Sequence, residues 1–90
     1  MPRPCKNRRT RCHPEANYFK PRGIPMRGLE EMILERDELE AIKLADYDGL
    51  KHEIGAEKMN ISRATFGRIL EKGRHKIAES IIKGKAIKIN

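Results

Sequence analysis

Tryptophan is absent from this 90-residue chain, and other aromatic side chains are scarce, with two phenylalanines and two tyrosines. A core built from this composition consists of Ile, Leu, Met and Ala, which suits helices better than a β-sandwich. At this length the chain is near the lower end of what buries a useful core. We therefore expect one small, mainly α domain.

Long apolar runs are also missing. No stretch reaches the roughly 18 apolar residues that cross a bilayer, and the charged start MPRPCKNRRTRCHPE lacks the apolar region of a secretory signal. We expect a cytoplasmic protein without membrane contact. Its two cysteines, Cys5 and Cys12, are then expected to be free thiols.

No catalytic set is recognisable. The chain has no Ser, His and Asp in a plausible order, no glycine loop for phosphate and no carboxylate pair in an apolar setting. We expect neither an enzyme nor a cofactor. The weak metal candidates are Cys5, Cys12 and His13, which lack a C-x-x-C pair and need a fourth ligand from elsewhere. A redox switch on the thiols is a rarer alternative.

Charge is segregated along the chain. Residues 1–28 carry eight Lys or Arg against one acid, residues 29–50 carry two against eight acids, and residues 51–90 carry ten against four. Two basic blocks around an acidic one favour a face that binds a polyanion and a face that avoids it. A basic protein with a solvated tail is the plainer alternative.

All five prolines fall within residues 1–28, which we interpret as a basic N-terminal arm preceding a domain over residues 29–90. The arm's second half is expected to dock on the domain through four apolar side chains: Tyr18, Phe19, Ile24 and Met26. EEMILE and AIKIN predict short flanking strands that pair with each other.

Three helices are expected in the domain. The first starts at Asp37, which forms a capping box with Glu40, and ends near Asp48 and Gly49. Its charged side chains are expected to face solvent. An acidic patch is expected from Glu30, Glu31, Glu38 and Glu40. The second spans Lys51 to Met59. The third starts at Ser62 and ends at Lys83, with a bend near Gly73 left open. Its expected buried residues are Phe66, Ile69, Leu70, Ile77, Ile81 and Ile82.

The last two helices match a helix-turn-helix. Counted from His52, a small residue falls at position five (Ala56), a residue that tolerates a left-handed turn at nine (Asn60), and apolar residues at ten, fifteen and eighteen. An ordinary helical hairpin shares this buried spacing, but the outward residues favour DNA. They are Ser62, Arg63, Ala64, Thr65, Arg68 and Lys72.

These side chains suit a DNA groove. Arginine reads guanine edges, Ala and the Thr methyl contact thymine, and hydroxyls hold phosphate. Within the arm, the basic run KNRRTR adds Lys6, Arg8, Arg9 and Arg11, which can follow the backbone or enter the minor groove. A solubilising tail is the alternative for that run.

MPRP, NYFKPRGIP, DELEAIKLADYDGL and ISRATFGRILE followed by KIAESIIKGKAI resemble a family of small bacterial and archaeal proteins described as predicted DNA-binding proteins of unknown function. The helix-turn-helix half is also similar to the promoter-reading C-terminal module (region 4) of bacterial sigma factors. That resemblance implies DNA contacts by Ser62, Arg63, Thr65, Arg68 and Lys72. Glu35 departs from it, since threonine usually caps that helix, and the sigma factor's other domains are missing, so a regulator is expected.

We therefore expect sequence-specific binding of double-stranded DNA. Alternatives are a protein-interaction module that engages RNA polymerase or another transcription protein through the acidic helix, and RNA binding, which the scarcity of stacking aromatics disfavours. A homodimer stays open, since many such readers bind palindromic sites in pairs.

Overall fold

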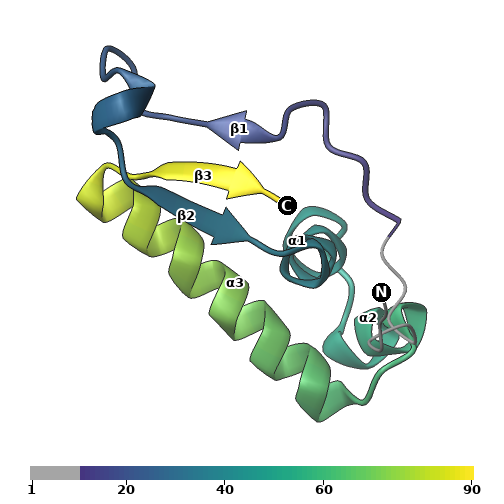
Figure 1. Cartoon of the computed structure of the whole chain (residues 1–90). Coiled ribbons are helices and arrows are strands. Elements are labelled where there is room, and N and C mark those ends of the chain that lie inside the picture. Colours follow the sequence, from purple (N-terminus) through teal and green to yellow (C-terminus); the bar gives the residue numbers. More distant parts are fainter. Residues whose placement is uncertain (1–10) are drawn as a thin grey trace, which may run out of the picture.

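The computed structural model describes residues 11–90, which are mostly helical, with three α-helices and a small three-stranded mixed sheet (Figure 1). In chain order the elements are β1 (Tyr18–Phe19), the 3-10 turn η1 (Met26–Gly28), β2 (Glu31–Leu34), α1 (Arg36–Ile42), the π-helical turn η2 (Lys43–Tyr47), α2 (His52–Met59), α3 (Arg63–Lys83) and β3 (Ala86–Ile89). None of the described helices combines the length and apolar content needed to cross a bilayer.

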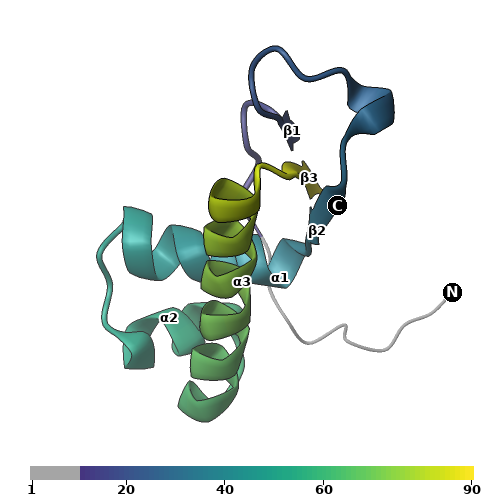
Figure 2. The same cartoon turned by 90° about the vertical axis from the view of Figure 1, so that its left-hand side faces the viewer.

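The sheet has the order β1-β3-β2. β3 pairs with β2, as expected for AIKIN and EEMIL, and this pairing is parallel; β3 also pairs with β1, in antiparallel. Figures 1 and 2 place this sheet toward the C-terminal end of α3 and place α2 toward its N-terminal end.

The arm's second half docks by a different means than expected. Tyr18 and Phe19 join the sheet through their backbone, opposite Lys88 and Ile87, whereas the side chains of Phe19 and Met26 are more than half exposed. Strand pairing therefore holds this segment, because a strand edge satisfies backbone hydrogen bonds without burying side chains.

The core lies between α1, η2, α2 and the first half of α3. It consists of Ala41, Leu44, Ala56, Met59, Phe66, Ile69 and Leu70. The expected burial of Ile81 and Ile82 is wrong, since they are 72% and 80% exposed, while Ser80 is buried. Ile82 is two residues from Ser80 and therefore on roughly the opposite side of the helix. Ile81 lies at the edge of the sheet, on an open hollow shared with Ser80, Phe19 and Ile87.

α3 is continuous over its 21 residues, so the bend considered near Gly73 is absent. A Cβ on Gly73 would lie 2.9 Å from Cδ1 of Ile42 and 3.1 Å from Cβ of Glu38. The glycine therefore serves the close approach of α1 to α3 rather than a kink.

The N-cap of α1 lies two residues earlier than expected. It is Glu35, and the capping box joins Glu35 to Glu38, not Asp37 to Glu40. The backbone N–H of Glu35 donates to Oε1 of Glu38 at 2.9 Å. Helical structure continues through η2 to Tyr47, close to the expected end.

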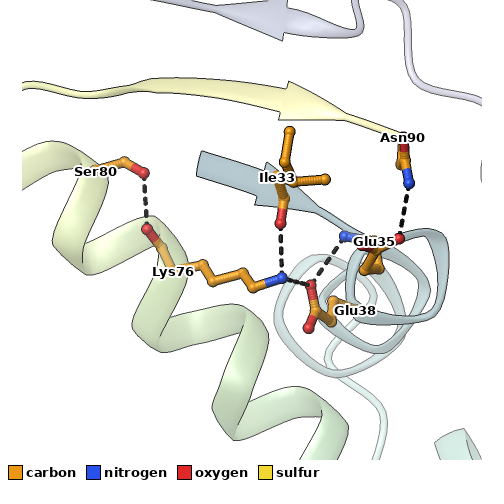
Figure 3. Close-up of polar contacts among 6 residues, drawn as sticks. All are labelled: Ile33, Glu35, Glu38, Lys76, Ser80 and Asn90. Atoms are coloured by element: carbon orange, nitrogen blue, oxygen red, sulfur yellow. Dashed lines mark hydrogen bonds and ion pairs between the residues drawn. The ribbon is translucent and has the colours of Figure 1, made fainter. Parts of the chain in front are cut away.

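The predicted acidic patch is wrong in two of its four residues, because Glu38 and Glu40 on α1 are only 3% and 5% exposed. Lys76 Nζ reaches Oε1 of Glu38 at 2.8 Å and the carbonyl oxygen of Ile33 at 2.6 Å. Figure 3 shows this network, to which Asn90 adds a bond from Nδ2 to Oε1 of Glu35. It ties β2, the start of α1 and the middle of α3 together.

Candidate nucleic-acid interface

The corner between α2 and α3 forms as the sequence predicts. Asn60 adopts the left-handed conformation, with φ 61° and ψ 44°, and the N–H of Ile61 donates to the carbonyl of Ala56 at 3.0 Å. A left-handed residue that closes such a bond ends a helix sharply. The chain therefore changes direction over the three residues between Met59, the end of α2, and Arg63, the start of α3.

Ser62 caps α3, also as predicted. Its Oγ accepts the N–H of Thr65 at 3.1 Å and donates to Oγ1 of Thr65 at 2.9 Å. Arg68 in turn donates to Oγ1 of Thr65 at 3.4 Å. Both hydroxyls predicted to hold phosphate therefore have hydrogen-bond partners at the start of α3. They cap the exposed N-terminus of the helix, and that of Thr65 also accepts a bond from Arg68.

Gly55 sets how closely the two helices cross, and sequence reasoning missed it by giving that function to Ala56. A Cβ on Gly55 would lie 2.6 Å from Cζ of Phe66, which is fully buried. The His52 ring lies against the same phenylalanine, with centroids 5.4 Å apart. The signal available in the sequence was the glycine at position four, beside the assigned alanine.

Three predicted cations occupy the first half of α3. Arg63, Arg68 and Lys72 are exposed, as is Ala64. Arg63 Nε lies 3.9 Å from Glu53, with both side chains about two-thirds exposed, so this ion pair is weak. No ion pair holds Lys72 within residues 11–90.

A groove of about 410 Å³ runs beside these cations. Thr65, Arg68, Ile69 and Lys72 line it from α3, and Glu35, Asp37 and Glu38 line it from the start of α1. The carboxylates on the α1 side of the groove repel an anion, so a phosphate would approach Arg68 and Lys72 from the α3 side.

Two of the three cations in the second half of α3, Arg74 and Lys76, are bonded within the protein, whereas Lys83 in the last turn is exposed. Arg74 donates to both carboxylate oxygens of Asp46, at 3.1 and 2.6 Å. These bonds lower the pKa of Asp46 and raise that of Arg74. Lys76 is paired with Glu38 in the network that also holds Ile33.

The N-terminal candidates are only partly visible. Lys6, Arg8, Arg9 and Cys5 lie outside the described residues. Arg11 and His13 are exposed and Cys12 is half-buried. Among the residues from 11 onward, no group of three or more His, Cys, Asp or Glu side chains is placed to hold a metal ion.

In comparisons with known proteins, residues 1–90 match the family model described as "Protein of unknown function DUF134". A "UPF0251 protein" of Desulfosudis oleivorans is 53% identical over 89 residues, 99% of this chain and 64% of that protein. A relative in Caldanaerobacter subterraneus is 52% identical, over 99% of this chain and 75% of its own length. One in Rhodospirillum rubrum is 46% identical over 90 residues, all of this chain and 63% of that protein.

These relatives are thus longer than the chain, and their names state no activity. No solved structure matches.

Proposed function

The chain belongs to the family described as "Protein of unknown function DUF134", and from this premise we propose that it is a sequence-specific double-stranded DNA-binding protein and transcriptional regulator. The observation that carries the proposal is the left-handed corner at Asn60, with the capped start of α3 exposed behind it. In a helix-turn-helix, the N-terminal residues of the second helix reach base edges in the major groove while the first helix crosses the backbone.

The exposed side chains of α3 suit this geometry. Arg63 and Arg68 take guanine edges, and the methyl of Ala64 takes a thymine methyl. Lys72 contacts phosphate, and the N–H groups of the first turn, beside Ser62 and Thr65, add partial positive charge toward the same backbone. Lys6, Arg8, Arg9 and Arg11 contact the backbone or the minor groove.

The similarity of this half to region 4 of sigma factors supports a role in transcription, with RNA polymerase or another transcription protein as a second partner. Protein interaction alone has less support, because Glu38 and Glu40 are buried and leave fewer carboxylates on the acidic helix. RNA binding has one favourable observation, Tyr47, which is 85% exposed. Single-strand readers usually combine several stacking aromatics.

Selection from a random duplex library tests the proposal, because it reports specificity, site length and symmetry together. We expect an enriched motif, and gel shifts at two salt concentrations should favour the selected duplex over random duplex, single-stranded DNA and structured RNA. Binding to duplex should weaken with salt, log K falling by about 0.9 per phosphate neutralised. No enrichment, or tighter binding to RNA, would reject it.

A further inference from the structure

Glu40 is a buried carboxylate with an unusual set of partners. It is 5% exposed, and its Oε1 accepts the backbone N–H of Arg11 at 2.8 Å and of Cys12 at 2.7 Å. A buried carboxylate costs stability unless it is hydrogen-bonded. Both of these donors come from a segment that precedes α1 by more than 20 residues, so Glu40 holds the N-terminal segment rather than its own helix.

Arg36 binds the same segment through a backbone carbonyl group, that of Cys12. Its Nη1 donates to the carbonyl oxygen of Cys12 at 3.2 Å. The two side chains of α1 therefore grip both the N–H and the C=O of Cys12. We call Glu40 and Arg36 the clamp.

The clamp lies beside α2. A polar hollow of about 290 Å³ is lined by Arg11, Glu40, Lys43, Leu44, Asp48 and Lys58. Lys43 is paired with Asp48 at 2.8 Å, whereas Lys58 has no ion pair in the part of the chain that the structure describes. Lys58 is in the last turn of α2, two residues before the corner at Asn60.

This inference rests on the proposed function. We propose that Glu40 and Arg36 are positioning residues that fix the C-terminal end of the basic run, Arg11, so that Arg11 and Lys58 form one phosphate-binding surface. The first helix of a helix-turn-helix crosses the DNA backbone, and Lys58 is on that helix. Fixing Arg11 beside Lys58 raises the effective concentration of its charge at the phosphates nearest α2.

The sign of a charge change separates this proposal from plain electrostatics. Removal of an acid from a DNA-binding protein normally strengthens its binding to a polyanion. Release of the run has the opposite effect. We expect Glu40→Ala to weaken duplex binding several-fold and to lower the salt slope by about 0.9 for each phosphate that the run no longer neutralises.

Glu57→Ala is the matched control, because Glu57 is an exposed acid on α2, and its removal should leave binding equal or stronger. Glu40→Gln keeps an oxygen acceptor for the two N–H groups and should retain most of the affinity. In a full chain carrying Lys6→Gln, Arg8→Gln and Arg9→Gln, Glu40→Ala should have a much smaller effect.

A second measurement is independent of DNA. In a Cys5→Ser background, Cys12 is the one remaining thiol, and its alkylation rate reports whether the clamp is closed. We expect Glu40→Ala and Arg36→Ala to raise that rate several-fold in protein that thermal melts show to be folded.

The outcomes are distinguishable. If the wild-type chain binds no duplex, the proposed function fails, whatever the alkylation rates show. If it binds duplex but Glu40→Ala leaves affinity, salt slope and Cys12 alkylation unchanged, or strengthens binding as Glu57→Ala does, the clamp is overturned.

Discussion

Lys72 and Lys76 lie four residues apart on α3, so they share one side of the helix. Lys76 is mostly buried, bonded to Glu38 and to the carbonyl oxygen of Ile33. Lys72 lies on the rim of the groove beside Arg68 and has no ion pair within the described range, 11–90. Of these two neighbouring lysines, one is therefore bonded within the protein and the other is available to a polyanion.

This comparison shows how far a charge count can mislead. Residues 51–90 carry ten bases, but Arg74, Lys76 and Lys85 are bonded to Asp46, Glu38 and Glu79. The positive charge that a polyanion can meet on α3 is concentrated in its first half. Single substitutions can test that division.

Lys76→Met should cause the largest change. It removes the partner of a buried carboxylate, which typically costs about 3–5 kcal/mol. Lys72→Met, one turn earlier, should alter the free energy of unfolding by no more than about 0.5 kcal/mol. Urea denaturation of both variants measures the difference.

In DNA binding the order of the two effects should be reversed, with Lys72→Met having the larger effect. Under conditions where both variants are folded, Lys72→Met should lower the salt slope by about 0.9, because one phosphate is no longer neutralised, while Lys76→Met leaves it unchanged. Equal effects of the two substitutions on stability would contradict the division of α3.

Gly55→Ala tests how α2 positions the first half of α3, and it changes no cation. The added Cβ would meet the buried Phe66 ring at 2.6 Å, and overpacking of this kind costs about 3 kcal/mol at the upper end of its usual range. Gly67→Ala is the matched control, because no atom lies within 4 Å of its Cβ position. Thermal and urea melts should show a loss for the first variant and no loss, or a gain of about 0.5 kcal/mol, for the second.

The corner and the ends of α3 could be predicted from the sequence because their causes are local. Asn60, Ser62 and Gly84 each act on the next few backbone groups, and each does so in the structure. The pairing of the two short strands could also be predicted, since each has the right pattern and only one partner of similar length was available.

The buried acids could not be predicted, because their partners are distant in sequence. Glu38 meets Lys76, and Glu40 meets the backbone of Arg11 and Cys12; no periodicity within α1 indicates either contact. The start of α1 was misplaced for a related reason: β2 ends at Leu34 and delivers Glu35 to the cap position. The candidate DNA-facing residues depend on the local corner, so they could be named from the sequence.

Arg68→Ala should affect recognition more than stability. If the guanidinium reads a base edge, its loss should cost about 1–3 kcal/mol against one base pair and relax preference there. Repeated selection from the random library should then lose information at a single position. Arg74→Ala, in the second half, is the control and should leave the selected motif intact. Uniform weakening across all sequences would assign Arg68 to phosphate instead.

The ion pair between Arg74 and Asp46 should give the smallest effect and a distinctive pH dependence. Arg74 holds the pKa of Asp46 below its ordinary value, so the stabilisation is present above the unfolded pKa of about 3.9 and is lost as pH falls through the folded pKa. The side chains are 51% and 39% exposed, so solvent screening limits the contribution to under about 1 kcal/mol. The difference in unfolding free energy between wild type and Arg74→Gln should therefore be constant near neutral pH and shrink below about pH 4.

Arg63→Gln supplies the control from the first half of α3. Its nitrogen is 3.9 Å from Glu53, and a pair this long and exposed contributes almost nothing. Urea melts from pH 7 downward should therefore show no pH-dependent difference between Arg63→Gln and wild type. A difference for Arg74→Gln that grew as the solution became more acidic would mean that Arg74 does not stabilise the ionised form of Asp46. Arg74 would then be as available to a polyanion as the cations in the first half of α3.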